Sequence, residues 1–278
     1  MTDALVTAER LTKSFHTASG SVRAVDSVSL TIFPGESLGL VGESGSGKST
    51  TARMIAGLEP PTSGEILFRG TPVRPPRNLA SRRVQARRAQ MVFQDPFGSL
   101  DPRQRLGNCL GEVIAVNGAP AGLSRAEYVA QLLERVGLEE RHSHSYPRAL
   151  SGGQRQRFAI ARALAPSPEL VILDEAVSAL DVSVQAQILN LLVELRQQSD
   201  VSYLFVSHDL AVVRQVCDRV IVMRHGEIVE EGDVEAVLTS PSHPYTQRLV
   251  ASVPSRGWRP PERMRVARRD ASPERGRV

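Results

Sequence analysis

The sequence has few cysteines, no long apolar run and no signal-peptide layout, and each of these absences argues against a class of protein. Its two cysteines, Cys109 and Cys217, lie far apart and without neighbouring histidines, so neither a disulfide nor a metal site with cysteine ligands is expected. No run of about 18 apolar residues occurs, which argues against a membrane-spanning helix. The opening segment MTDALVTAER lacks the charged-then-apolar layout of a signal peptide, so we expect the chain to stay in the cytoplasm.

Excess positive charge is also missing from most of the chain. Residues 256–278 hold eight arginines and three acidic residues, a net charge of +5, so the +4 of the whole chain leaves −1 for residues 1–255. The basic segment has little apolar content, and we predict a disordered tail there rather than a nucleic-acid-binding surface. A second basic run, residues 74–88, contains six arginines, and we interpret it as a solvated helix face.

A glycine-rich stretch at residues 42–50, GESGSGKST, is the most informative motif. It follows the apolar run 37–41 and precedes a segment with helical spacing, which is the strand–loop–helix context of a phosphate-binding loop. Glycines let successive N–H groups point into one concavity, and the following helix adds the positive end of its dipole. Lys48 would reach the β- and γ-phosphates, and the Ser49 hydroxyl would ligate Mg²⁺. The predicted loop residues are Gly42, Glu43, Ser44, Gly45, Ser46, Gly47, Lys48, Ser49 and Thr50.

Polar residues follow three further buried-strand patterns. Residues 169–173 lead into Asp174 and Glu175, residues 91–93 into Gln94, and residues 201–206 into His208. In an open α/β sheet the carboxyl ends of the strands face the ligand crevice. We therefore predict Asp174 as a magnesium ligand, Glu175 as the group that orients or deprotonates an attacking water, and His208 as a γ-phosphate contact.

Residues 96–165 are predicted to be helical, with periodic segments at 106–116, 125–136 and 154–164, and to be inserted between strands of the sheet. Within them, Leu-Ser-Gly-Gly-Gln immediately precedes a helix. Ser151 suits an N-cap, and Gly152 and Gly153 expose N–H groups at the helix start. This second anion site lacks a lysine and lies in a different subdomain. We therefore expect two subunits to pair head to tail and complete each other's sites.

The remaining segments complete an α/β architecture. Residues 4–32 alternate apolar and polar side chains, which predicts antiparallel strands, and a returning strand is expected at 65–68. Phe15 is placed in a loop between two such strands, where it could stack on an adenine or pack into the small sheet. A helix is predicted over 184–195 and a hairpin at 220–230. We expect one nucleotide-binding domain over residues 1–255, with the helical insertion and the tail 256–278.

The motifs together resemble the ATP-binding cassette (ABC) transporter ATPases. GESGSGKS, Gln94, LSGGQ at 150–154, LVILDE at 170–175, SALD at 178–181 and His208 occur in that family's order and spacing, over about residues 5–254. The resemblance implies a RecA-like core and a sandwich dimer that hydrolyses two ATPs to drive a pair of membrane subunits. It makes Glu175 the catalytic base, Gln94 a Mg²⁺ contact, and Phe15 the adenine platform. Its further nucleotide contacts, partly with the partner's ATP, are Ser151, Gly152, Gly153, Gln154 and Asp181.

A narrower resemblance points to the importers of dipeptides, oligopeptides and nickel. VFQDPFGSLDPR at 92–103, DEAVSALDVSVQAQILNLL at 174–192 and HPYTQRLVASVP at 243–254 carry it. Ala176-Val177 departs from the wider family's Pro-Thr, and no cysteine cluster supports an iron–sulfur centre. The resemblance implies a peripheral protein at the cytoplasmic face of the inner membrane, two permease subunits, a second cassette and an extracytoplasmic solute-binding protein.

The competing interpretations are a soluble cassette ATPase acting on nucleic acid or ribosomes and a phosphoryl transferase of another phosphate-loop type. The first would usually carry two cassettes, a long coiled coil or a zinc-binding insertion, and the second leaves LSGGQ without a role. Two questions stay open at this point, namely the transported solute and whether the dimer partner is a copy or a paralogue.

Overall fold

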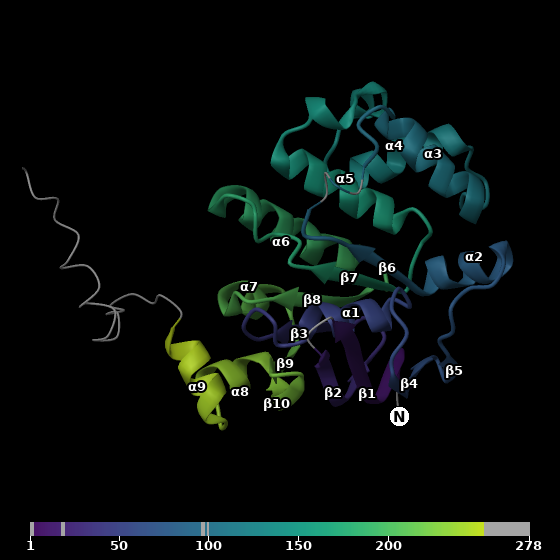
Figure 1. Ribbon diagram of the computed structural model, residues 1–278. Helices are drawn as coiled ribbons and strands as arrows, with labels where there is room; N and C mark the ends of the chain where they lie inside the picture. Colours follow the sequence, from purple (N-terminus) through teal and green to yellow (C-terminus); the bar gives the residue numbers. More distant parts are fainter. Residues whose placement is uncertain (1–2, 18–19, 96–97, 99, 253–278) are drawn as a thin grey trace, which may run out of the picture.

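The computed structural model describes residues 3–17, 20–95, 98 and 100–252. The tail predicted at 256–278 lies outside the described residues, as do positions 96, 97 and 99 at the start of the predicted insertion. Figure 1 shows a central sheet with a small sheet beneath it and a helical lobe above it.

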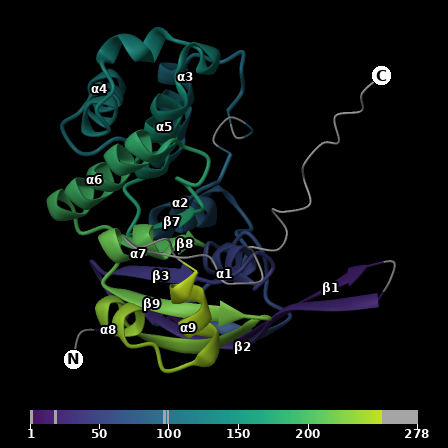
Figure 2. The same cartoon turned by 90° about the vertical axis from the view of Figure 1, so that its left-hand side faces the viewer.

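The described part of the small sheet consists of antiparallel strands in the order β2-β1-β4-β5. The prediction of antiparallel strands over residues 4–32 is confirmed, and β1 and β2 form a long hairpin that projects from the body in Figure 2. Phe15 was predicted to lie in a loop, and this is wrong. It pairs with Val22 inside β1, because the ladder continues to the end of the hairpin through several register shifts. The bounds are β1 Val6–Thr17, β2 Gly20–Ile32, β4 Ser63–Phe68 and β5 Thr71–Pro72.

The central sheet runs in the order β10-β9-β3-β8-β7-β6 within the described ranges, and its neighbouring strands are parallel except for the β9–β10 hairpin. Every residue of β3, β7 and β8 is buried, which explains why the middle of each segment is apolar without alternation and why polar residues stand only at the strand ends. The bounds are β3 Ser37–Val41, β6 Ala89–Val92, β7 Leu170–Asp174, β8 Ser202–Ser207, β9 Arg219–Arg224 and β10 Glu227–Asp233.

Two hydrophobic clusters lie on the two faces of this sheet. Because side chains alternate along a strand, Ile172 and Leu204 point to the cluster shared with the small sheet, whereas Leu173 and Phe205 point to the cluster shared with the helical lobe. The helices are α1 Lys48–Ile55, α2 Leu79–Arg88, α3 Leu106–Asn117, α4 Arg125–Arg135, α5 Gly152–Leu164, α6 Val182–Gln198, α7 Leu210–Val216, α8 Val234–Thr239 and α9 Pro244–Ala251, with 3₁₀ turns at Glu140–His144 and Pro147–Ala149.

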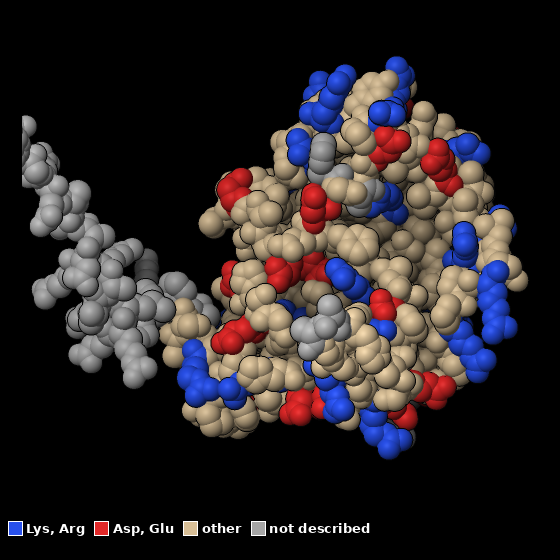
Figure 3. All heavy atoms as spheres, viewed as in Figure 1, with Lys and Arg blue, Asp and Glu red and all other residues tan. Residues whose placement is uncertain are grey.

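The basic run at residues 74–88 contains α2, which has no buried residue. Its arginines are Arg82, Arg83, Arg87 and Arg88, and positive side chains gather at the edge of the molecule where α2 lies (Figure 3). The interpretation of this run as a solvated helix face is therefore confirmed for α2. Asn78 begins the helix with a capping box, which supplies the local stability that an exposed helix lacks from packing.

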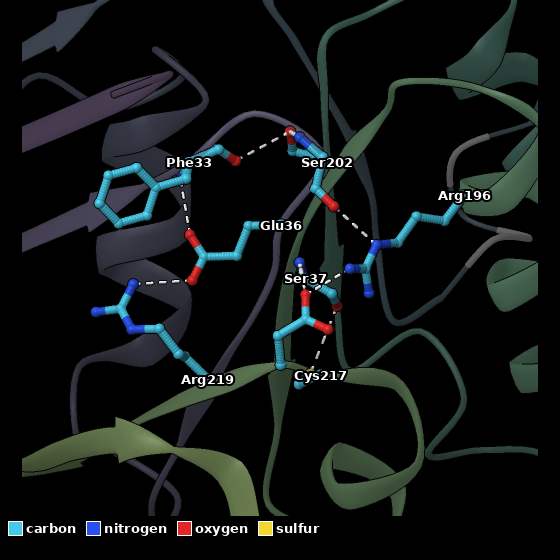
Figure 4. A network of polar contacts seen from close by, with 9 residues as sticks. Phe33, Glu36, Ser37, Arg196, Ser202, Cys217 and Arg219 are labelled. Atoms are coloured by element: carbon cyan, nitrogen blue, oxygen red, sulfur yellow. Dashed lines mark hydrogen bonds and ion pairs between the residues drawn. The ribbon is translucent and has the colours of Figure 1, made fainter. Parts of the chain in front are cut away.

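A polar network fixes the start of β3, at the opposite end of the strand from the glycine-rich loop (Figure 4). Arg219 Nη1 lies 2.8 Å from Glu36 Oε1, and the second oxygen of Glu36 accepts a hydrogen bond from the Phe33 N–H at 2.6 Å. The Gly35 N–H donates to Ser202 Oγ at 2.8 Å, which joins the same turn to β8. Because these bonds pin the entry to β3, the strand delivers the loop after Val41 in a fixed register.

Candidate functional site

The loop between β3 and α1 has the conformation that its glycines permit. Gly42, Gly45 and Gly47 have φ angles of 152°, 80° and 102°. A Cβ on Gly42 would lie 2.2 Å from the Met223 carbonyl oxygen, and one on Gly47 would lie 2.4 Å from the Ala24 carbonyl oxygen. At Gly45 a Cβ would meet nothing within 4 Å. The loop is therefore packed tightly on the body at its two ends and open at its middle, as a concave cradle for a ligand requires.

Lys48 points back into this loop. Its side chain is 4% exposed, and its Nζ donates to the carbonyl oxygens of Gly42 and Glu43 at 2.9 and 2.8 Å. Burial lowers the pKa of Lys48, while the carboxylates of Glu175, Asp174 and Glu43 oppose that shift. The lysine thus lies close to Asp174, the last residue of β7, and to Glu175, the residue after it, as expected where a phosphate loop and a strand end meet at one edge of the sheet.

Ser49 and Asp174 face each other across the crevice. Ser49 Oγ donates to Asp174 Oδ1 at 2.7 Å, although the two residues are 125 positions apart. Burial raises the pKa of Asp174, and the Ser49 hydrogen bond and the charge of Arg53 lower it. A hydroxyl oxygen and a carboxylate oxygen are hard donors that suit Mg²⁺, so the residues present fit the predicted metal.

Glu175 lies one residue beyond β7, in an unusual backbone conformation. Its φ is 49°, and its N–H donates to the Val206 carbonyl oxygen at 3.0 Å. His208 Nδ1 lies 3.5 Å from Glu175 Oε1, so the ends of β7 and β8 bring the predicted base and the predicted γ-phosphate contact together. A strained φ at a carboxylate of this kind is typical of functional sites.

Gln94 reaches the same edge from the end of β6. Its Nε2 lies 3.5 Å from Ser178 Oγ, which in turn donates to the Glu175 carbonyl oxygen at 2.9 Å. The Gln94 side chain is exposed, and so are Glu43, Ser44 and Gly45 of the loop. Gln94 and this part of the loop are therefore accessible to a ligand from solvent.

Ser151 is the N-cap of α5, which lies in the helical lobe (Figure 1). Its hydroxyl accepts from the Gln154 N–H at 3.3 Å, and Gln154 Oε1 accepts from the Ser151 N–H at 2.9 Å, which is a complete capping box. Gly152 is exposed, whereas a Cβ on Gly153 would lie 2.5 Å from Val184 Cγ1 of α6. In the described part of the chain no hydrogen bond or ion pair joins residues 151–154 to the loop 42–50.

Two predicted contacts lie outside the crevice. Asp181 caps α6, where its carboxylate accepts from the Val184 N–H at 2.9 Å, and this bond with that of Ser183 lowers its pKa. Phe15 is 39% exposed, and Lys13 Nζ lies 5.2 Å from its ring centroid. The ring is therefore not enclosed by the small sheet.

Two contacts at the loop were not predicted from the sequence. The Glu43 N–H donates to the Tyr245 hydroxyl oxygen of α9 at 3.0 Å, and Tyr245 is 3% exposed. The Gly226 N–H, in the β9–β10 turn, likewise donates to the Ser46 carbonyl oxygen at 3.0 Å. The segment HPYTQRL served only as a marker of resemblance, since a tyrosine 202 positions away carries no local signal for the loop.

Comparisons with known proteins agree with this geometry. The family described as ABC transporter matches residues 25–178, and the family described as oligopeptide/dipeptide transporter, C-terminal region, matches residues 229–277. The glutathione import ATP-binding protein GsiA of Escherichia coli (strain K12) is 52% identical over 235 residues, which cover 84% of this chain and 37% of that protein. Its counterpart in Salmonella typhimurium is 50% identical over 242 residues, or 86% and 38%. The chain thus spans about two fifths of the length of these relatives.

Solved structures are similar over nearly their full length. The ATP-binding cassette MJ0796, solved as a dimer in a post-hydrolysis state bound to ADP and Pi, has a TM-score of 0.72 and 32% identity, covering 82% of this chain and 98% of that one. CbiO1 from Clostridium perfringens, part of the ABC transporter complex cbiONQ, has a TM-score of 0.74 and 29% identity, with 86% and 92% covered. The α/β cassette fold predicted from the motifs is confirmed.

Among the described residues, no helix is both long and apolar enough to cross a bilayer. The phosphate loop, the acidic pair at the end of β7 and the family match over residues 25–178 lead to one conclusion: the chain belongs to the ABC transporter family.

Proposed function

We propose that this chain is the ATP-hydrolysing motor subunit of an importer for peptides or a related small solute. The observation that carries the proposal is the convergence of Lys48, the Ser49–Asp174 pair and the Glu175–His208 pair at one edge of the central sheet. These groups supply the parts that phosphoryl transfer to water requires: a cationic cradle, a metal position and a base.

ATP would place its β- and γ-phosphates against the loop 42–50. The Lys48 Nζ, which now bonds two loop carbonyl oxygens, is close enough to exchange these partners for phosphate oxygens. Phe15 would stack on the adenine through its exposed ring. Ser49, Asp174 and Gln94 would hold Mg²⁺, which neutralises charge on the phosphates when bound.

Glu175 would act on the water that attacks the γ-phosphate. Its carboxylate can accept a proton from that water, and the His208 ring 3.5 Å away can contact the γ-phosphate and hold the carboxylate in place. Asp174 bonds Ser49 whereas Glu175 lies beside His208, so the two carboxylates would serve different oxygens.

A head-to-tail dimer would complete the site. Ser151, Gly152, Gly153 and Gln154 would contact the γ-phosphate bound by the partner subunit, with Asp181 at the same interface. The exposed start of α5 supports this arrangement, because among the described residues it makes no hydrogen bond to the chain's own loop and a helix N-terminus suits an anion. The dimer reported for MJ0796 is consistent with it.

The cargo and location follow from the relatives rather than from the site. The names of the similar proteins refer to glutathione import and to oligopeptide or dipeptide transport. We infer that the chain works as a peripheral protein at the cytoplasmic face of the inner membrane. It would drive two permease subunits, to which a solute-binding protein delivers the solute. The match at residues 229–277 favours transport over a nucleic-acid or ribosomal ATPase.

Glu175→Gln tests the proposal. Purified full-length chain should retain ATP binding but hydrolyse ATP at least ~10²-fold more slowly, since a general base contributes 10²–10⁴-fold. Glu169→Gln is the matched control, because it makes the same change just before the same strand, at a partly exposed residue paired with Arg69. Near-normal turnover in Glu175→Gln would move the base elsewhere, and failure of the unaltered chain to bind ATP would overturn the proposed function.

A further inference from the structure

The C-terminal helix α9 makes a direct hydrogen bond to the phosphate loop. The Tyr245 hydroxyl accepts the Glu43 N–H at 3.0 Å, while the ring is buried and the Arg224 guanidinium lies 5.2 Å from its centroid. Glu43 is the second residue of the loop, directly after Gly42. The bond therefore acts where the chain leaves β3 and begins to curl.

Lys48 shares this part of the loop. Its Nζ donates to the Glu43 carbonyl oxygen at 2.8 Å, so the peptide units on both sides of Glu43 are held, one by Tyr245 and the other by Lys48. When Lys48 turns to a phosphate it gives up its bond, and the Tyr245 bond then remains to hold this turn. Preorganised N–H groups bind an anion without a further cost of ordering the loop.

The position of Tyr245 is itself fixed by a second set of contacts. Glu230 of β10 accepts from the Ser242 N–H at 2.7 Å, the Ser242 hydroxyl at 2.8 Å and the His243 N–H at 3.1 Å. His243 then caps α9, with its Nδ1 accepting the Tyr245 N–H at 3.1 Å. Burial would raise the pKa of Glu230, but the hydrogen bonds that it accepts from Ser242 and His243 help to lower it to about 2. The anchor is thus charged at neutral pH.

We propose that Tyr245 is a positioning residue for the nucleotide, whose hydroxyl holds the first turn of the phosphate loop in its binding conformation, with Glu230 as the anchor that places it. The inference rests on the proposed function, because it assigns Tyr245 to the same phosphate site. It makes the segment 242–251 part of the nucleotide-binding unit, although none of its residues lies in the loop motif.

The test is Tyr245→Phe in the full chain, which removes the hydroxyl and keeps the ring. Leaving a partly buried N–H without a partner should raise the Kd for the magnesium complex of AMP-PNP, a non-hydrolysable ATP analogue, about fivefold by titration calorimetry. The KM for ATP should rise by the same factor with kcat little changed, as expected for loss of uniform binding. Amide hydrogen exchange at Glu43 should become faster.

Tyr128→Phe is the matched control. Its hydroxyl donates to the Ala165 carbonyl oxygen at 3.1 Å in the helical lobe, so the substitution removes a buried tyrosine hydrogen bond far from the loop. It should lower thermal stability while leaving the Kd unchanged. Glu230→Gln should also raise the Kd, by a smaller factor than Tyr245→Phe. The factor by which the double variant raises the Kd should be smaller than the product of the two single factors, because both substitutions act through the same hydrogen bond.

An unchanged Kd and unchanged exchange at Glu43 in Tyr245→Phe would overturn this inference, provided that the unaltered chain binds AMP-PNP. Equal shifts in Tyr245→Phe and Tyr128→Phe would also overturn it, because they would reduce Tyr245 to general stability. Failure of the unaltered chain to bind the analogue would instead overturn the proposed function, and the role of Tyr245 would fall with it.

Discussion

Gly152→Asp is the sharpest test of the composite site. Gly152 is the first residue of α5 and is exposed, and a Cβ there would meet only Leu180 Cδ2, at 3.7 Å. A side chain is therefore tolerated in the free subunit, in contrast to Gly153, where Val184 lies in the way. In the proposed sandwich the same position faces the γ-phosphate of the partner's ATP, so an aspartate would oppose it.

The size of the effect follows from the charges. Two like charges about 4 Å apart in a partly hydrated cleft, with an effective dielectric constant of about 20, repel by about 4 kcal/mol. Since about 1.4 kcal/mol corresponds to a factor of ten, ATP-dependent dimerisation should weaken by about 10³-fold. Gly152→Asn has nearly the same shape without the charge, and it should weaken dimerisation far less.

Sedimentation of the full chain with ATP, in a Glu175→Gln background that prevents turnover, measures this effect. Gly152→Asp should bind ATP as a monomer through its intact loop and fail to dimerise. If the chain pairs with itself, mixing Gly152→Asp with Lys48→Ala, both carrying the natural Glu175, should restore hydrolysis at one composite site per mixed dimer. If it pairs with a second cassette, adding that partner should restore one site to either variant.

Two results would refute the reasoning. Loss of ATP binding by the Gly152→Asp monomer would mean that the loop and the start of α5 serve one nucleotide within a single chain. If Gly152→Asn weakened ATP-dependent dimerisation as much as Gly152→Asp, the size of the side chain rather than its charge would be what prevents dimerisation.

Two further predictions concern the loop and its anchor. Gly42→Ala should abolish ATP binding and lower the free energy of unfolding by about 3 kcal/mol, because its Cβ would lie 2.2 Å from the Met223 carbonyl oxygen. Gly45→Ala has open space around its Cβ, so it should lower the free energy of unfolding only by the ~1–2 kcal/mol of backbone strain. Equal losses for the two variants in denaturant unfolding would contradict this prediction. The pKa of Glu230 is lowered from its ordinary value of 4.5 to about 2 in the folded chain. This shift stabilises the fold above pH 4.5, and the stabilisation is lost as the pH falls through the folded pKa. Glu230→Gln should therefore unfold more easily than the unaltered chain at pH 7, by about 1 kcal/mol after screening, and the difference should shrink toward pH 2; a difference independent of pH would contradict the assignment.

Several features of the candidate site could be predicted because short sequence patterns indicate them. The continuous apolar runs before Asp174 and His208 predict strands buried on both faces, and the structure places both residues where those strands end. The glycines of the loop signal backbone angles that other residues avoid, and Gly42, Gly45 and Gly47 adopt them. Ser49 and Asp174 were each predicted as a magnesium ligand from their own motif, and in the structure their oxygens lie 2.7 Å apart.

Other features depend on contacts between distant segments, and no local pattern encodes them. Phe15 lies in a strand because Val22 pairs with it across the hairpin, which alternation by itself does not specify. Tyr245 meets Glu43 only because Glu230 anchors the chain before α9, and three segments must pack together before that bond exists. The sequence by itself determined the chemistry of each segment through spacing and residue type, whereas the tertiary structure alone decided which distant segments meet, since such contacts depend on the packing of the whole sheet.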